Sequence, residues 1–156
     1  DCGIAFILLP HLKNSAINGA VKWEGHNRVV LALNDRRCYA DTFWFAMFHE
    51  IKHIMQQKIK NVFVSLASGN ISVLNSSLEK EADQFARNYL IPPEKYSSFI
   101  EKKDFSQESI IGFASSIGIH PGIVVGRLQF DKYIKPSMFN QLKTKYKIVL
   151  ELPQQG

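Results

Sequence analysis

The sequence predicts an α+β domain in which a small twisted sheet precedes a long central helix and a C-terminal helical bundle. Three observations support this fold class. Short β-prone runs, separated by Asn and Gly, occupy the first forty positions. Residues 42–58 then run without Gly or Pro, as a long helix does. After residue 77, four further segments have helical patterns with helix-ending residues behind them.

The composition is that of one globular domain. The chain has 156 residues, of which 46% are hydrophobic and 21% charged, enough for one sizeable core but short of two ordinary domains. No apolar run approaches the roughly 20 residues of a membrane span, so we expect a soluble cytoplasmic protein with no membrane contact. The net charge of +5 permits contact with nucleic acid but falls short of a dedicated basic arm. Cys2 and Cys38 form a poor disulfide framework and suit a reducing compartment.

The chain begins at Asp1 without an initiating Met, and the apolar run at residues 4–9 lacks the basic region of a signal peptide. We therefore expect further residues upstream in the natural protein. Within the 156 residues we expect a single domain, with mainly strands in 1–40, a helical catalytic core in 41–130 and a C-terminal extension in 131–156.

The first elements are three short strands and the long helix. The strands are expected at residues 4–9, 20–23 and 28–33, in an antiparallel or mixed sheet. The helix follows at 42–58, with Asp41 placed to cap its first turn. Its first turns are apolar on every side, which predicts a helix buried centrally in the core.

The remaining elements are a strand, four helices and a closing strand. We expect them, in this order, at residues 62–66, 78–90, 94–100, 106–117, 121–130 and 147–152. A segment rich in Ser, Asn and Gly at 67–77 is expected to be a loop. Ser106 is placed as an N-cap, and Gly118 as a C-terminal stop.

The residues that carry chemistry lie inside the long helix, where positions 49–53 read HEIKH, an HExxH motif. Residues four apart lie one turn apart on the same side of a helix, so His49 and His53 can share one Zn²⁺ ion. Glu50 lies about 100° around the helix from His49, where its carboxylate can take a proton from a water activated by the metal. The alternative is two core histidines satisfied by hydrogen bonds.

A catalytic zinc site needs a third protein ligand, and the helix at 78–90 offers acidic candidates. Glu79 lies within roughly 50° of the centre of the apolar face of that helix, whereas Glu81 lies more than about 100° away. We therefore expect Glu79 to be the ligand; the alternative is a first-turn carboxylate favoured by the helix dipole. Asp83, four residues after Glu79, is expected to accept an N–H from a ligand histidine and fix its tautomer.

This donor set predicts amide hydrolysis. Water activated by zinc would attack a peptide carbonyl, and Glu50 would pass the proton on to the leaving amine. A further donor to the oxyanion is expected, although plain packing or surface hydrogen bonding is the alternative for each candidate. The candidates are Tyr39, Tyr89, Tyr96 and His120.

Two stretches of the sequence are similar to the ImmA/IrrE family of zinc metallopeptidases. Residues 41–53 read DTFWFAMFHEIKH, and residues 79–92 read EKEADQFARNYLIP. The similarity continues through IGIHPGIVVGRLQ at 117–129 and covers most of the chain from about 34 to 130, whereas the opening strands match only in character. The chain most resembles the version found downstream of a helix-turn-helix module in HigA-like antitoxin or regulator proteins.

The resemblance implies a zincin-like fold with metal ligands at His49, His53 and Glu79 and a catalytic base at Glu50. It also implies cleavage of a repressor or other DNA-binding protein, with contact to DNA only through an upstream helix-turn-helix module. The sequence departs from the family at Lys52, where relatives commonly have Gly. A long cation there removes no ligand, but it could narrow the cleft, alter partner choice or weaken close helix packing.

Two other functions are compatible with parts of the sequence. Residues 109–129 have the helix, Gly turn and helix order of a DNA-binding helix-turn-helix, but the second helix offers chiefly Arg127 and Gln129 to bases amid Ile, Val and Leu. We therefore expect that pair to pack in the core. A zinc-binding sensor or regulatory domain without proteolytic activity would use the same ligands, so the sequence does not separate it from a peptidase.

Overall fold

The computed structural model has the predicted α+β architecture. It describes residues 3–10, 17–25, 27–34, 39–56, 63–66 and 73–146. The predicted closing strand at 147–152 and both cysteines lie outside the described residues. Within that part of the chain, no single helix is both long and apolar enough to cross a membrane. Only the bent pair of α4 (Gln107–Ser116) and α5 (Pro121–Phe130) meets this test jointly.

Four strands form a mixed sheet in the order β1-β3-β2-β4. β1 lies parallel to β3, while β2 runs antiparallel to both β3 and β4. The sheet is therefore the mixed one of the two predicted alternatives, and β1 begins and ends at the predicted residues. The strands are β1 (Ile4–Leu9), β2 (Ile17–Trp23), β3 (Val29–Asn34) and β4 (Phe63–Leu66).

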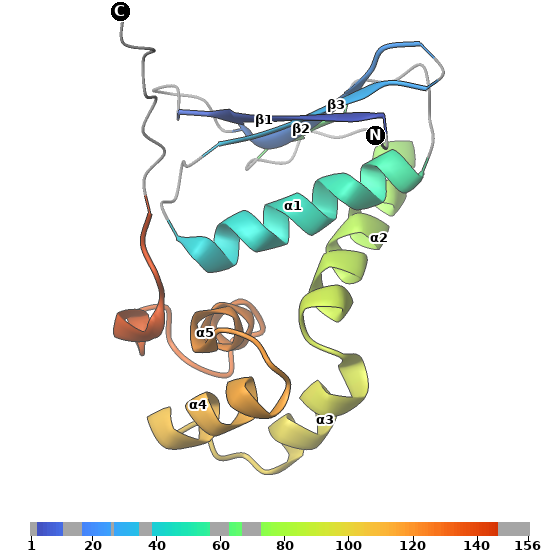
Figure 1. Ribbon diagram of the computed structural model, residues 1–156. Helices are drawn as coiled ribbons and strands as arrows, with labels where there is room; N and C mark the ends of the chain where they lie inside the picture. Colours follow the sequence, from blue (N-terminus) through green and yellow to red (C-terminus); the bar gives the residue numbers. More distant parts are fainter. Residues whose placement is uncertain are drawn as a thin grey trace, which may run out of the picture.

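One face of the sheet packs on the long helix α1 (Ala40–Met55). Side chains alternate across a strand, and on β3 the buried positions are Val29, Leu31 and Leu33. Met47 and Ile51 of α1 pack against this buried row. Figure 1 shows α1 lying along the sheet, with α5 on its other side. The helix thus occupies the middle layer of the domain.

Two predictions about α1 are wrong in detail. Its first turns are not buried on every side, because Trp44 is 42% exposed. Asp41 does not cap the helix: Tyr39 is the N-cap residue, without a side-chain cap bond, and Asp41 lies in the first turn. The Asp41 carboxylate instead forms an ion pair with Lys143, 2.8 Å away, with both side chains 10% exposed. The ion pair with a nearly buried ammonium group is stronger than the hydrogen bonds that backbone amides of the first turn would donate to this carboxylate.

The second long helix, α2 (Val73–Leu90), begins five residues before the predicted start. Residues 73–77 are helical, so the loop prediction is wrong for them, and residues 67–72 lie outside the described part of the chain. Ser and Asn are only mildly unfavourable in helices, and packing of α2 across α1 outweighs that preference. Figure 1 shows α2 crossing α1 and leading down to the C-terminal helices.

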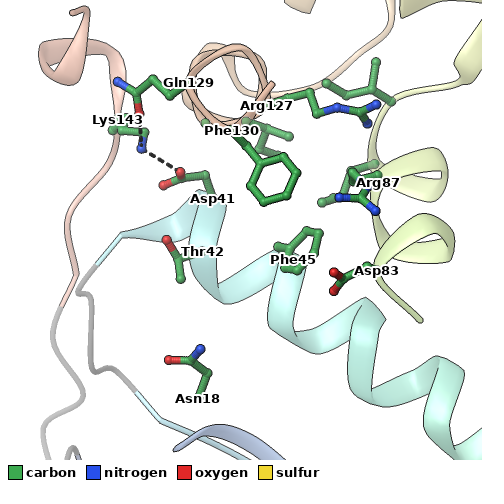
Figure 2. Close-up of a pocket in the computed structure, with 14 residues that line it drawn as sticks. Asn18, Asp41, Thr42, Phe45, Asp83, Arg87, Arg127, Gln129, Phe130 and Lys143 are labelled. Atoms are coloured by element: carbon green, nitrogen blue, oxygen red, sulfur yellow. Dashed lines mark hydrogen bonds and ion pairs between the residues drawn. The ribbon is translucent and has the colours of Figure 1, made fainter. Parts of the chain in front are cut away.

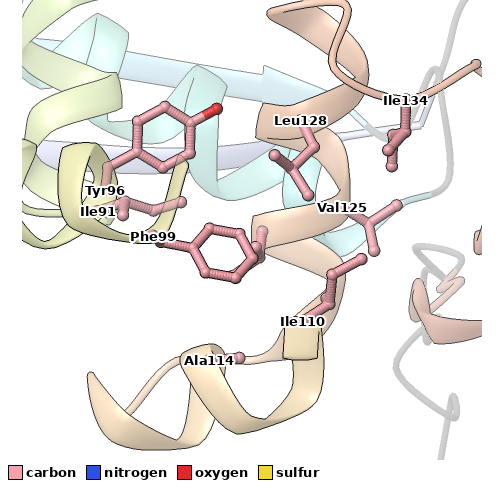
Figure 3. Packing of buried hydrophobic residues seen from close by; sticks show 9 residues of the cluster. Ile91, Tyr96, Phe99, Ile110, Ala114, Val125, Leu128 and Ile134 are labelled. Atoms are coloured by element: carbon pink, nitrogen blue, oxygen red, sulfur yellow. The ribbon is translucent and has the colours of Figure 1, made fainter. Parts of the chain in front are cut away.

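Three short helices form the predicted supporting bundle: α3 (Pro93–Glu101), α4 (Gln107–Ser116) and α5 (Pro121–Phe130). Ser106 is the N-cap of α4 and accepts the amide hydrogen of Ser109, so its predicted role at the start of the helix is confirmed. Gly118 follows the helix with a φ of +71°, which confirms its predicted role as the C-terminal stop. The core side chains are drawn in Figure 3: Ile91, Tyr96, Phe99, Ile110, Ala114, Val125, Leu128 and Ile134.

The apolar side of α5 faces this core, as predicted for a packing helix. Val124, Val125 and Leu128 are fully buried. Beyond α5, a short 3₁₀ helix, η1 (Asn140–Leu142), leads into a segment that returns to the start of α1. There the amide of Ala40 donates to the carbonyl of Thr144 at 2.9 Å. The bundle is thereby tied to the helix that carries HExxH.

Candidate metal centre

Three side chains from two helices converge between α1 and α2. Nε2 of His49 lies 3.0 Å from Nε2 of His53. The two oxygens of Glu79 divide between the rings, with Oε2 3.2 Å from His49 Nε2 and Oε1 3.2 Å from His53 Nε2. Both histidines are buried, and Glu79 is partly buried. This group could hold a metal ion, and it contains the three residues that the sequence predicts as ligands.

The Nδ1 atoms of the two rings, which point away from the centre, both face hydrogen-bond acceptors. Nδ1 of His49 lies 2.9 Å from Oδ1 of Asp83, the contact expected for that carboxylate. Nδ1 of His53 lies 2.9 Å from Oε1 of Gln56. The orientation of the Gln56 amide follows from its other contacts, because its NH₂ group donates to the Leu78 carbonyl and to Glu81 Oε2. Each Nδ1 therefore carries the ring hydrogen.

With the hydrogen on Nδ1, the Nε2 atom of each neutral ring is a hydrogen-bond acceptor. In the neutral rings, the Nε2 lone pairs of His49 and His53 point at each other and at the Glu79 carboxylate. Three acceptors facing one point repel one another unless a proton or a cation lies among them. Zinc with ligand distances of about 2.0 to 2.1 Å in tetrahedral geometry separates two ligand atoms by about 3.4 Å. The observed separations of 3.0 to 3.2 Å are close to this value, so the donor set fits such an ion.

The electrostatics of the metal-free centre follow from the same contacts. Burial lowers the pKa of His49, but hydrogen bonds to Asp83 and Glu79 and the nearby charge of Glu50 outweigh it and raise the pKa to about 9. Burial raises the pKa of Glu79, but hydrogen bonds to His49 and His53 outweigh this and lower it to about 2. The centre is thus built to hold positive charge beside an ionised carboxylate.

Glu50 lies on the sheet side of α1 and is fully buried. Strand β2 passes so close to it that a Cβ atom on Gly19 would lie 2.7 Å from Glu50 Oε1 and 2.8 Å from its Cγ. The sequence suggests only a turn-forming role for Gly19, but the residue lies inside β2. The absence of a side chain there lets the sheet approach the buried carboxylate.

Gln56 is the contributor that sequence reasoning missed. It lies three residues after His53, at the C-cap of α1, and bridges His53 to α2. The sequence could have predicted this contact, because a residue three positions after His53 lies on the same side of the helix.

Lys52 bonds to α2 and does not project into open space. Its Nζ lies 2.8 Å from Glu81 Oε1 and 5.6 Å from the centroid of the Phe85 ring, and its side chain is 18% exposed. Lys52 and then Gln56 hold the pKa of the Glu81 carboxyl below its usual range. These contacts oppose the weakened helix packing considered for this cation, because they join α1 to α2. Glu81 thus links the two helices beside the metal centre.

Two of the four suggested oxyanion donors have structural partners in the bundle. The Tyr96 hydroxyl donates to Asp131 Oδ2 at 2.8 Å, and burial together with that carboxylate raises the pKa of Tyr96. His120 Nδ1 accepts the Gly122 amide hydrogen and so caps α5. Tyr89 is 63% exposed, and Tyr39 precedes α1 beneath the ammonium groups of two lysines.

A cleft of about 540 Å³ lies beside the metal centre, lined mainly by residues of α1, α2 and α5 and open to solvent. Asp83, the partner of His49, forms part of its wall, as does Phe45, whose ring centroid lies 6.1 Å from that of His49. Asn18, the neighbour of Gly19, also lines it. In Figure 2, Asp83 and Arg87 extend from α2 toward Phe45 and Phe130. The cleft thus borders the centre through Asp83 and Phe45, while the three metal-site side chains and Glu50 do not line it.

Comparison of the chain with protein-family models and with characterised proteins finds no match.

Proposed function

We propose that this chain is a zinc-dependent metallo-endopeptidase that cleaves a cytoplasmic repressor or another DNA-binding regulatory protein. One observation carries the catalytic part of the proposal. The Nε2 atoms of His49 and His53, which are acceptors when the rings are neutral, and the Glu79 carboxylate face one point, and the nearby Glu50 is buried. Two imidazoles and a carboxylate form a recurrent catalytic zinc set. The choice of substrate rests on the resemblance to the ImmA/IrrE family.

In this proposal each protein group has a distinct task. His49, His53 and Glu79 would hold the ion, which when bound supplies Lewis acidity and lowers the pKa of water to about 7. Asp83 and Gln56 keep the hydrogens of the two rings on Nδ1, so that both Nε2 atoms remain available to the metal. Glu50 accepts the proton of the attacking water and delivers it to the leaving amine.

A non-proteolytic zinc-binding sensor or regulatory domain of a transcriptional regulator or antitoxin is the second candidate. It is favoured by the engagement of Tyr96 and His120 in the bundle, which removes two candidate donors to an oxyanion. The ligands would be the same, so the two functions differ only in the role of Glu50.

The test is a comparison of the zinc-loaded chain with its Glu50→Gln variant, incubated with candidate repressors encoded nearby. Fragments are identified by mass spectrometry, and a chelator provides the metal-free control. We expect the variant to keep its zinc and lose cleavage, while Glu94→Gln, at an exposed site on α3, cleaves normally. Equal cleavage by Glu50→Gln would contradict the peptidase assignment. Retained regulatory output without cleavage would favour the sensor.

A further inference from the structure

The charges in the cleft are not evenly paired. Three cationic side chains line it, and two of them have carboxylate partners. Lys143 pairs with Asp41, and Arg127 pairs with Asp131. Arg87 is the third, and in the part of the chain that the structure describes no acidic side chain forms an ion pair with it.

The neighbour that would ordinarily neutralise Arg87 is engaged elsewhere. Asp83 lies four residues earlier on α2, the spacing of a helical ion pair. Its carboxylate instead accepts the hydrogen of His49 Nδ1 at 2.9 Å. The orientation of a metal-centre histidine thus engages the carboxylate that would otherwise pair with Arg87.

The Arg87 side chain contacts an aromatic ring of the cleft wall. Its guanidinium carbon lies 5.0 Å from the centroid of the Phe130 ring, and its side chain is partly buried. Contact with an aromatic ring occupies one face of the guanidinium and leaves its edge, which carries the N–H donors, available. Figure 2 shows Arg87 on the wall of the cleft beside Asp83. A partly buried guanidinium that forms no ion pair with the described residues favours an anionic ligand.

The position of Arg87 on α2 sets its reach from the metal centre. It lies eight residues after Glu79, which is about 12 Å along a helix at 1.5 Å per residue. An extended polypeptide advances about 3.3 Å per residue, so this length corresponds to three or four residues of a bound strand. The cleft volume of about 540 Å³ accommodates several side chains.

We infer that this cleft binds an extended segment of the polypeptide substrate and that Arg87 selects an acidic side chain, Asp or Glu, three or four residues from the scissile bond. The inference rests on the proposed peptidase function for the identity of the bound segment. The acid-binding site itself depends only on Arg87 and the cleft.

The test measures peptide binding and not cleavage. The probes are fluorescein-labelled decapeptides of Ala, Leu and Gln in which a single Glu is moved through the ten positions, each paired with the all-neutral peptide. Fluorescence anisotropy is recorded with the zinc-loaded Glu50→Gln variant, so that no probe is consumed. At one or two positions we expect the Glu peptide to bind about tenfold more tightly, as a charge-assisted hydrogen bond allows.

Charge reversal supplies the matched variants. In the same background, Arg87→Glu should abolish the preference for Glu and favour Lys at the same position. Lys95→Glu makes the same change of charge at an exposed site on α3 and should leave the preference unaltered. Equal binding of acidic and neutral peptides at every position, or no measurable binding of any peptide at millimolar concentration, would overturn the inference, as would an unchanged preference in Arg87→Glu.

Failure of this inference is distinguishable from failure of the proposed function. Anisotropy is also measured on metal-free protein. An Arg87-dependent preference for Glu in a chain that neither binds zinc nor cleaves any candidate would retain the acid-binding site and reject the peptidase. Zinc-dependent cleavage without a charge preference would retain the peptidase and reject the role of Arg87.

Discussion

Nε2 of His49 and Nε2 of His53 lie 3.0 Å apart although both are acceptors when the two Nδ1 atoms carry the hydrogens. Residues outside the metal centre impose this arrangement, because Asp83 and Gln56 each occupy an Nδ1. The same contacts orient the rings and make their inner nitrogens more basic. The affinity for the metal should therefore depend on Asp83 and Gln56 as well as on the residues that bind the ion.

The first prediction concerns Gln56, whose amide bridges His53 to α2. Gln56→Leu removes the acceptor that fixes the His53 ring, and we expect it to weaken zinc binding about 10- to 100-fold. Competition with a chromogenic chelator measures this affinity. Gln107→Leu, at a partly exposed amide on α4 that bonds to Gln141, is the matched control and should bind zinc normally. An unchanged zinc affinity in Gln56→Leu would show that the His53 ring keeps its hydrogen on Nδ1 without the Gln56 amide.

The second prediction concerns the pH dependence of metal binding. With a pKa of about 9, His49 is protonated in the metal-free protein at neutral pH, and zinc must displace that proton. The apparent affinity should therefore rise about tenfold per pH unit between pH 7 and 9, and this contribution should level off above pH 9. Calorimetry in buffers of different ionisation enthalpy measures the released proton. Binding without proton release at pH 7 would contradict the raised pKa.

The third prediction concerns the stability of the metal-free protein. The pKa of His49 is about 9 in the folded chain against an ordinary 6.5, so protonation stabilises the fold. This contribution, up to about 3 kcal/mol, is fully present below pH 6.5 and is lost as the pH rises through 9. Thermal unfolding with a chelator at pH 6 and 9.5 tests it. The loss seen in the wild type should be absent from His49→Gln; an equal loss in both proteins would assign it to other groups.

The elements that the sequence predicted well are those with a strong local signal. β1 and α5 begin and end at the predicted residues, because each is an apolar run bounded by turn-forming or helix-starting residues. Spacing on one helix brings His49 and His53 together. The approach of Glu79 to both rings required a helical-wheel argument on a second helix, and it succeeded because the apolar side of α2 packs on α1.

The features that the sequence did not predict depend on residues distant along the chain. Asp41 has the position of a helix cap, but Lys143, about a hundred residues later, takes its carboxylate. Gly19 resembles a turn residue, and only the packing of β2 on Glu50 reveals why a side chain is excluded. Both cases arise from tertiary contacts that outweigh a local preference.

The last prediction concerns Gly19, where the sheet meets the buried Glu50. A Cβ atom at this position would lie 2.7 Å from Glu50 Oε1 and 2.8 Å from Leu33 Cδ2, so Gly19→Ala must displace the carboxylate or the strand. We expect a loss of about 1 to 3 kcal/mol in the free energy of unfolding, as overpacking causes. The proposed metal ligands on α1 and α2 are untouched, so the zinc content of protein loaded with zinc should remain near that of the wild type. Any hydrolysis should fall because Glu50 is displaced.

Gly112→Ala is the matched control, because a Cβ atom there meets nothing within 4 Å. Gly112 lies inside α4, where Ala is the better helix former, so this variant should be unchanged or more stable by up to about 1 kcal/mol. Chemical denaturation of both variants, with zinc content measured in parallel, gives the comparison. If Gly19→Ala were as stable as Gly112→Ala, the close approach of β2 to Glu50 would be wrong, since an added methyl group could be accommodated there only if the strand lay farther from α1.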